Sequence, residues 1–295
     1  MLPENLEKAK AQFAQARPMI EAFEKYFGRY PFEKDWFKLI EVPYSGMEHQ
    51  SAVTYGNRFA NGYLERDWTG VGVSLKFDFI IVHESAHEWF GNAVTNADLS
   101  DMWIHEGWAT YLECLYVEHV FGYADALKYV NGYTSKVRHQ EPIIPPRGIN
   151  RTPPGDQYFK GALFLHTLRS VVGDDARWWA LIRGFYQRFK YRAVSTNEVL
   201  AYFSRETSQD LGPIFDQYLR QPYVPTLDLQ FQDGGQVAYR WNAAAKGFAM
   251  PVKVGQKDRW QTIRPTTEWQ TMTTSLARDD FEVATDLYYV NVSKQ

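Results

Sequence analysis

The stretch His83-Glu84-Ser85-Ala86-His87, followed at a distance by Glu106, constrains this chain more than any other part of its sequence. Residues at positions i and i+4 of a helix project from one face, a single turn apart. Two histidines at that spacing can bind one small cation, and neutral imidazole is a good ligand for zinc. The pattern therefore predicts a helix that carries two ligands of a metal site.

Two carboxylates complete the predicted site. Glu84 lies beside the histidines on the helix, where it can act as a base on a metal-bound water without being a ligand. Eighteen residues separate His87 from Glu106, which is enough to leave the first helix and begin a second one. Two histidines and one glutamate leave the fourth position on zinc for water. We therefore predict one Zn²⁺ per chain, held by His83, His87 and Glu106.

Large apolar residues surround both parts of this pattern. Trp89 and Phe90 continue the first segment, and Glu106 lies among the aromatic residues of segment 103–111. The five-residue pattern alone also occurs on ordinary amphipathic helices. A carboxylate in apolar surroundings, however, needs a partner, and a metal ion is one. The flanking residues therefore favour a metal site over a solvated helix face.

Taken together, these motifs resemble those of the M1 family of zinc aminopeptidases, a group of gluzincins. The family pattern is His-Glu-x-x-His, eighteen residues and Glu, with Trp-Phe-Gly-Asn after the first part and Glu-Gly-x-Ala around the second. Segment 45–49, Ser-Gly-Met-Glu-His, resembles the family's Gly-x-Met-Glu-Asn exopeptidase motif. Segment 158–161, Tyr-Phe-Lys-Gly, resembles its Tyr-x-Lys-Gly segment. The resemblance is strong over residues 1–225 and loose beyond them.

The resemblance implies an α+β fold, with a thermolysin-like zinc metallopeptidase domain over residues 1–224 and a small all-β sandwich domain over 225–295. The residue pattern agrees with the second part, because the hydrophobic period changes to two after the two prolines of 222–225. We expect strands in the stretches 226–232, 237–241, 250–254 and 287–292. No chemistry is visible in them, and packing support is the expected role.

The resemblance also assigns roles to residues outside the metal pattern. An exposed edge strand carrying Gly46 and Met47 would accept the substrate backbone as an added strand. Glu48 would bind the free ammonium group of a peptide substrate, and Tyr158 would donate a hydrogen bond to the oxyanion. Without the resemblance, Glu48 has the properties of an ordinary surface carboxylate and Tyr158 those of a common core residue.

Other elements follow from periodicity and capping. We expect helices over 4–27, 77–92, 101–121 and 123–139, the first of them kinked at Pro18 and ended by Gly28. We also expect a strand over 35–42 and an edge strand and hairpin within 43–72. A five-proline loop over 141–155 is expected to run along a cleft, and Ser195 is expected to begin a capping box. Glu113 either bonds a ligand histidine or is solvated. His105 is expected to be structural, and Lys160 and Arg147 are expected to be exposed.

Composition limits the possible partners. The chain has 295 residues, 45% of them apolar, and a net charge of −3, which favours neither nucleic acid nor a membrane surface. Without an apolar run long enough to cross a bilayer, we expect a soluble chain and no membrane insertion. The single Cys114 cannot form an internal disulfide and is expected to be buried. No signal peptide is visible, and only the family resemblance favours an extracytoplasmic location.

Several features leave alternatives open. The family motif has Gly where this chain has Ser45, Asn where it has His49, and Asn where it has His105. Because members of the family usually carry an N-terminal β domain, we expect this chain to be a fragment that normally packs against one. The alternatives to an aminopeptidase are a zinc hydrolase or endopeptidase without amino-terminal selectivity and a non-catalytic interaction domain. An intact Glu84 argues against the last, and the preferred N-terminal residue does not follow from the sequence.

Overall fold

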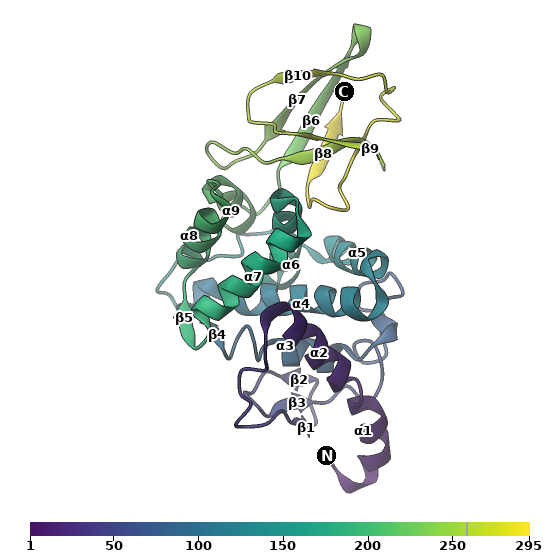
Figure 1. Ribbon diagram of the computed structural model, residues 1–295, viewed down its shortest axis with the longest axis vertical. Coiled ribbons are helices and arrows are strands. Elements are labelled where there is room, and N and C mark those ends of the chain that lie inside the picture. The colour runs from purple at the N-terminus through teal and green to yellow at the C-terminus, as the bar shows by residue number, and fades with distance from the viewer. Residues whose placement is uncertain (258) are drawn as a thin grey trace.

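A computed structural model describes residues 1–257 and 259–295. Helices dominate the first three quarters of the chain and strands the last quarter, and Figure 1 shows these strands gathered at the end of the molecule opposite the N-terminus. The helices of this described part are α1 (Leu6–Phe13), α2 (Ala16–Phe27), α3 (Phe79–Ala86), α4 (Trp103–Phe121), α5 (Tyr123–Gly132), α6 (Asp156–Val172), α7 (Asp175–Phe189), α8 (Thr196–Thr207) and α9 (Gly212–Leu219).

Within the described residues, the strands form four small sheets. Two belong to the helical part, with strand orders β1-β3-β2 and β4-β5, and two belong to the C-terminal part, with orders β10-β7-β6-β12 and β11-β8-β9. Their bounds are β1 (Leu39–Glu41), β2 (Gly46–Met47), β3 (Val53–Tyr55), β4 (Val94–Asn96), β5 (Arg192–Val194), β6 (Thr226–Gln232), β7 (Gln236–Asn242), β8 (Val252–Gln256), β9 (Arg259–Ile263), β10 (Gln270–Thr273), β11 (Glu282–Val283) and β12 (Asn291–Lys294).

The first predicted helix is in fact two helices, so the expectation of one helix kinked at Pro18 is wrong. The break falls between α1 and α2, ahead of the proline. Pro18 is the third residue of α2, where a backbone N–H has no intrahelical acceptor, so proline is tolerated there. Gln15, at the break, accepts a hydrogen bond from the backbone N–H of Asp78 at 2.8 Å. Gly28, at φ +98°, ends α2 as predicted.

The sheet β1-β3-β2 provides the predicted edge strand. β2 pairs antiparallel with β3 on one side only, and β1 pairs parallel with β3 on the other. The strand expected over 35–42 is shorter than predicted, because Trp36 has φ +62°, which no strand residue adopts. A Cβ atom on Gly46 would lie 2.9 Å from Cγ of Glu84. The edge strand therefore lies directly against α3, and only glycine fits at this contact.

Helices α4 and α6 pack against each other through two glycines. A Cβ atom on Gly161 of α6 would lie 2.8 Å from Cα of Gly107 in α4, and one on Gly107 would lie 3.1 Å from Cα of Gly161. The absence of both side chains lets the two backbones approach closely, as predicted for Gly161. This contact places the first turn of α6, which carries Tyr158, beside the first turn of α4, which carries Glu106.

The C-terminal sheets dock firmly on the helical part. The carbonyl of Asp286 accepts hydrogen bonds from Asn131 and His166, both at 2.9 Å, and the backbone N–H of Tyr289 donates to Oγ1 of Thr167 at 3.0 Å. These contacts explain a correction: the strand expected over 287–292 begins only at Asn291, because the preceding residues bond to helices. β6 has the predicted bounds. The division into domains at residue 224 remains a prediction.

The remaining elements include one confirmed prediction at Ser195 and one helix that is shorter than expected. Ser195 caps α8, with both reciprocal hydrogen bonds to Glu198 present, as predicted. The helix expected over 123–139 ends at Gly132 and continues as a short 3₁₀ turn, Tyr133–Lys136. Cys114 is buried, as expected. Within the described residues, no helix combines the length and apolar character needed to cross a bilayer.

Candidate active site

Helix α3 positions the predicted metal pattern and begins at a buried cap. The carboxylate of Asp78 accepts the backbone N–H groups of Ile80 and Ile81, which satisfies two donors that the first turn leaves unpaired. The helix ends at Ala86, so the expectation of a helix to residue 92 is wrong. His87 still has helical angles (φ −63°, ψ −19°), and it therefore keeps its place one turn after His83.

The three predicted ligands converge. His83, His87 and Glu106 each offer one ligand atom, and these atoms lie within 4.8 Å of one another. Oε2 of Glu106 is 3.3 Å from Nε2 of His87 and 3.7 Å from Nε2 of His83. This oxygen is buried and makes no hydrogen bond to any residue that the structure describes. Two imidazole nitrogens and one unpaired carboxylate oxygen that face a common point suit a zinc ion by chemistry and by number.

The other nitrogen of each histidine has its own partner. Nδ1 of His83 lies 2.6 Å from Oε1 of Glu113, and Nδ1 of His87 lies 3.0 Å from the carbonyl oxygen of Phe90. An acceptor at Nδ1 fixes the proton there and leaves Nε2 free to bind a metal. Glu113, an undecided residue in the sequence, is therefore buried against a histidine rather than solvated.

Glu113 is itself held by two tyrosines that sequence reasoning missed. Tyr129 donates a hydrogen bond to its Oε2 at 2.6 Å, and the hydroxyl of Tyr133 donates to the same oxygen. Both come from the segment that follows α4, four residues apart. Their spacing is helical, but no short-range signal connects them to a carboxylate more than a dozen residues earlier.

Charges in the cluster stabilise one another. Burial opposes ionisation of Glu106, but the nearby histidines outweigh this effect and hold the pKa of Glu106 below its usual value. Burial lowers the pKa of His87, but the charge and hydrogen bonding of Glu106, together with the charge of Glu84, raise it above its usual value. The point that these side chains face is therefore one where a positive charge is favoured.

Glu84 of α3 lies next to this cluster, and its half-buried side chain packs against Gly46 of the edge strand. Burial raises its pKa, and so do the charges of Glu48 and Glu106, although the two histidines oppose the shift. A carboxyl group with a raised pKa is suited to accept a proton and later release it near neutral pH. The charge of Glu48, the residue after β2, therefore contributes to the raised pKa of Glu84.

Tyr158 also reaches the site. Its hydroxyl donates a hydrogen bond to Oε1 of Glu106 at 2.9 Å, and its ring lies 6.0 Å from that of His83. Burial, followed by the charge of Glu106, raises the pKa of the phenol, so it stays protonated and can donate a hydrogen bond at neutral pH. The structure thus brings Glu84 and Tyr158 together with the three predicted ligands.

The edge strand reaches the site through its backbone. Met47 is exposed, Glu48 is half-buried and follows the strand, and the carbonyl of Glu48 accepts a hydrogen bond from Asn92 at 2.9 Å. Asn92 belongs to the turn after α3, so the end of β2 is tied to the segment that carries the histidines. His49 is exposed.

Of two expectations about nearby residues, the one for Lys160 is wrong and the one for His105 is confirmed. Lys160 is fully buried rather than exposed, because its ammonium donates to the carbonyls of Gln221 at 2.6 Å and Pro222 at 3.0 Å. Burial lowers its pKa to about 8. His105 is structural as expected: its Nε2 accepts the backbone N–H of Asn96 at 2.9 Å, and burial lowers its pKa to about 4.

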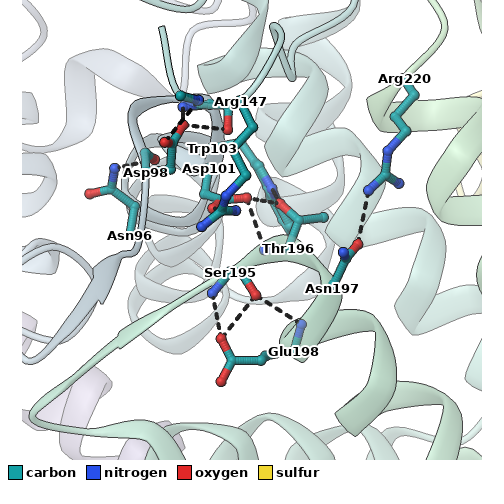
Figure 2. A network of polar contacts seen from close by, with 12 residues as sticks. Asn96, Asp98, Asp101, Trp103, Arg147, Ser195, Thr196, Asn197, Glu198 and Arg220 are labelled. Carbon is teal, nitrogen blue, oxygen red and sulfur yellow. Dashed lines mark hydrogen bonds and ion pairs between the residues drawn. The ribbon is translucent and has the colours of Figure 1, made fainter. Parts of the chain in front are cut away.

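Arg147 pins the proline-rich loop to the start of α4. Its guanidinium donates to Asp101 at 2.9 Å, and Asp101 also accepts the backbone N–H and the hydroxyl of Thr196 (Figure 2). The backbone N–H of Gly148 donates to Asp98 at 3.1 Å. This network, which joins the loop, α4 and α8, lies just before the turn that carries Glu106.

A cavity of about 570 Å³ opens beside the metal cluster. His83, Glu84 and Tyr158 form part of its wall, and the rest is mainly apolar and aromatic. These other lining residues are Tyr44, Ser45, Gly46, Tyr63, Trp68, Phe79, Ile80, Thr110, Glu113, Tyr133, Gly155 and Phe159. We call it the aromatic cavity. Its size and the few polar groups converging in it are typical of a ligand site.

Comparison with known proteins identifies the family. Residues 11–218 match the model of the peptidase family M1 domain, and the chain belongs to that family. It is 24% identical over 240 residues to a leucyl aminopeptidase of Saccharolobus solfataricus, covering 77% of this chain and 30% of that protein. It is 26% identical over 210 residues to endoplasmic reticulum aminopeptidase 1 of Mus musculus, covering 67% of this chain and 22% of that protein.

Solved structures agree with the fold. A crystal structure of a mutant M1 zinc metallopeptidase from Deinococcus radiodurans, bound to a Tyr-Ser-Ala substrate, matches with a TM-score of 0.55 and 25% identity. The match covers 70% of this chain and 44% of that chain. A second, two-domain M1 zinc metallopeptidase, bound to L-tryptophan, gives a TM-score of 0.57. The predicted α+β metallopeptidase fold with a C-terminal β part is confirmed. The chain spans less than a third of the length of the curated relatives described above.

Proposed function

We propose that this chain carries the active site of a zinc-dependent aminopeptidase, which hydrolyses the first peptide bond of a peptide and releases its N-terminal amino acid. The convergence of His83, His87 and Glu106 at the aromatic cavity is the observation that carries the proposal. These three residues would hold the zinc ion. A bound zinc ion supplies Lewis-acid chemistry, because it lowers the pKa of water and polarises a carbonyl group.

Three side chains perform the remaining work in this proposal. Glu84 takes a proton from the attacking water and delivers it to the leaving amine, a role that its raised pKa supports. Tyr158 turns its hydroxyl from Glu106 towards the carbonyl oxygen that becomes negative. Glu48 binds the free ammonium group of the substrate, and the backbone of Gly46 and Met47 pairs with the peptide, because β2 has an unpaired edge.

The proposal is tested with aminoacyl chromogenic substrates and their N-acetylated forms, each with and without a zinc chelator. Cleavage of the free-amine forms only, abolished by the chelator, is the expected result. The variant Glu48→Gln should then raise KM for the free-amine substrates. Equal cleavage of acetylated and free-amine forms would mean a zinc hydrolase without amino-terminal selectivity. Binding of zinc without cleavage of any substrate would contradict the enzymatic proposal for this chain.

A further inference from the structure

The order of residues along β2 gives a direction to a bound peptide. This step rests on the proposed function, in which Glu48 holds the ammonium end. Ser45 and Gly46, at the other end of the strand, line the aromatic cavity, whereas Glu48 is not among its lining residues. A peptide paired antiparallel to β2 therefore runs from Glu48 into the aromatic cavity. The residues that follow the cleaved bond would lie there.

A second cavity, of about 590 Å³, adjoins the aromatic cavity. The two share Trp68, Gly155 and Phe159 as walls, and the rings of Trp68 and Phe159 lie 6.2 Å apart. The second cavity is otherwise polar, with walls from the segment after α5 and from the end of the proline-rich loop. We call it the cationic cavity, for Lys136 and Arg138 in its wall. A peptide that leaves the aromatic cavity past Trp68 enters it.

The two cations of this cavity have no carboxylate partner. Nζ of Lys136 lies 4.0 Å from the centroid of the Trp68 ring. Over residues 1–257 and 259–295, no carboxylate oxygen lies within 4.0 Å of the charged nitrogens of Lys136 or Arg138. Burial lowers the pKa of Lys136, and the charge of Asp67 only partly opposes this. A partly desolvated ammonium without a carboxylate is unfavourable, and a ligand carboxylate would relieve that cost.

The acidic residues of the cationic cavity are already engaged. The carboxylate of Asp156 accepts the backbone N–H groups of Arg138 and His139, both at 2.8 Å. Glu141 forms an ion pair with Arg151. Both carboxylates thus have partners of their own, whereas Lys136 and Arg138 have no carboxylate partner among the described residues.

The distance to the metal cluster suits a short peptide. Ring centroids of His83 and Phe79 lie 5.3 Å apart, those of Phe79 and Trp68 lie 5.9 Å apart, and Lys136 stands 4.0 Å beyond. These steps set an upper limit on the span. Because an extended chain advances about 3.3–3.6 Å per residue, about four to five residues cover that limit.

We propose that Lys136, with Arg138 beside it, binds the C-terminal carboxylate of short peptides whose amino end lies at Glu48. The substrate class is then peptides of about three to five residues that end in a free carboxylate. The aromatic cavity holds the residues between the cleaved bond and the carboxylate, and its walls favour large apolar side chains there.

The test compares the tetrapeptide Ala-Phe-Ala-Ala as a free acid and as a C-terminal amide. Its dissociation constants are measured by calorimetry on zinc-loaded Glu84→Gln protein, which removes the proposed base, and KM is measured on the wild type. We expect the acid to bind about tenfold more tightly than the amide, the size of one charge-assisted hydrogen bond. The ratio of the two dissociation constants should approach one when Lys136→Met is added to the Glu84→Gln protein. It should also approach one for peptides of eight residues.

Control variants and outcomes separate this inference from the proposed function. Lys128→Met removes an exposed lysine of α5 that neither cavity contains, and it should keep the tenfold ratio. Equal binding of the acid and the amide by protein that retains Lys136 would overturn the inference. It would not count against the proposed aminopeptidase activity. A ratio that survives in Lys136→Met would also overturn it. Failure to bind either peptide would count against the proposed function, and this inference would fall with it.

Discussion

Nδ1 of His83 lies 2.6 Å from Oε1 of Glu113, on the opposite edge of the imidazole from the nitrogen that faces Glu106. One histidine is thus held between two carboxylates from the same helix, two turns apart along α4. Glu113, which does not face the cluster, fixes the proton on Nδ1. Glu106 lies near Nε2, whose lone pair is free to bind a metal. The binding properties of the cluster therefore depend on a residue outside it.

Loss of the charge on Glu113 should weaken metal binding. In Glu113→Gln, the partner of His83 becomes neutral, and we expect zinc affinity to fall about 10–100-fold, the usual effect of such outer partners. Competition with a chromogenic chelator measures this affinity. Glu21→Gln, a change at an exposed carboxylate of α2, serves as the control and should leave affinity unchanged. An unaltered affinity in Glu113→Gln would show that the 2.6 Å contact does not tune the site.

Removing the proposed base should separate metal binding from turnover. Glu84 is not among the three clustered ligands, so Glu84→Gln should retain zinc by elemental analysis. Turnover should fall by at least about 10²–10⁴-fold, because proton transfer in the transition state is lost. Near-normal rates with zinc bound would rule out Glu84 as the base.

Tyr158→Phe should act on the turnover rate. Because a hydrogen bond to a developing negative charge strengthens in the transition state, we expect kcat to fall about 10²–10³-fold with little change in KM. The Glu106 carboxylate, which now accepts from the phenol at 2.9 Å, keeps its two histidine neighbours. Zinc content should therefore be unchanged. A change confined to KM would argue for a role in ground-state binding only.

The glycine contact between α4 and α6 should be intolerant of a side chain. Gly161→Ala places a methyl group 2.8 Å from Cα of Gly107, and backbone atoms on both sides must shift. We expect a loss of about 1–3 kcal/mol in the free energy of unfolding, seen as a lower urea midpoint at constant m. Gly155→Ala is the matched control, because a Cβ atom on Gly155 would meet open space and its φ is −59°. This variant should leave the free energy of unfolding nearly unchanged. Equal midpoints for the two variants would contradict the close approach.

Acid should destabilise the junction between helices and C-terminal sheets through His166. Burial, and to a lesser degree the charge of Arg169, lowers the pKa of this imidazole to about 4. As pH falls from 6.5 to 4, the unfolded chain takes up a proton that the folded chain does not. Stability contributed by the neutral imidazole is therefore lost across that window, by up to about 3 kcal/mol.

The variant His166→Gln isolates this effect. Glutamine keeps an N–H donor for the carbonyl of Asp286 but does not titrate. Urea midpoints at pH 7.0, 5.5 and 4.5, converted to unfolding free energies, should fall less steeply in the variant than in the wild type. Parallel pH dependence of the two proteins would show that His166 does not contribute.

Local patterns were sufficient for the parts of this protein that depend on backbone geometry. The i, i+4 spacing of His83 and His87 determines that both face one point wherever the segment is helical. Ser195 caps its helix through residues three positions away, and Gly28 ends α2 by its own positive φ. The edge strand was predicted from its turn residues. Each of these features is decided within a few residues along the chain.

Tertiary structure decided what lies across from those patterns. Lys160 was expected in solvent, but the carbonyls of residues 221 and 222 enclose its ammonium, sixty residues later in the chain. The choice of Glu113 between solvent and His83 depends on how α3 packs against α4, which brings Nδ1 of His83 to 2.6 Å from Oε1 of Glu113. The sequence by itself determined the ligand types and the helices that carry them. Only packing decided their partners and the cavities beside them, because those contacts join distant segments and leave no periodic signal in either one.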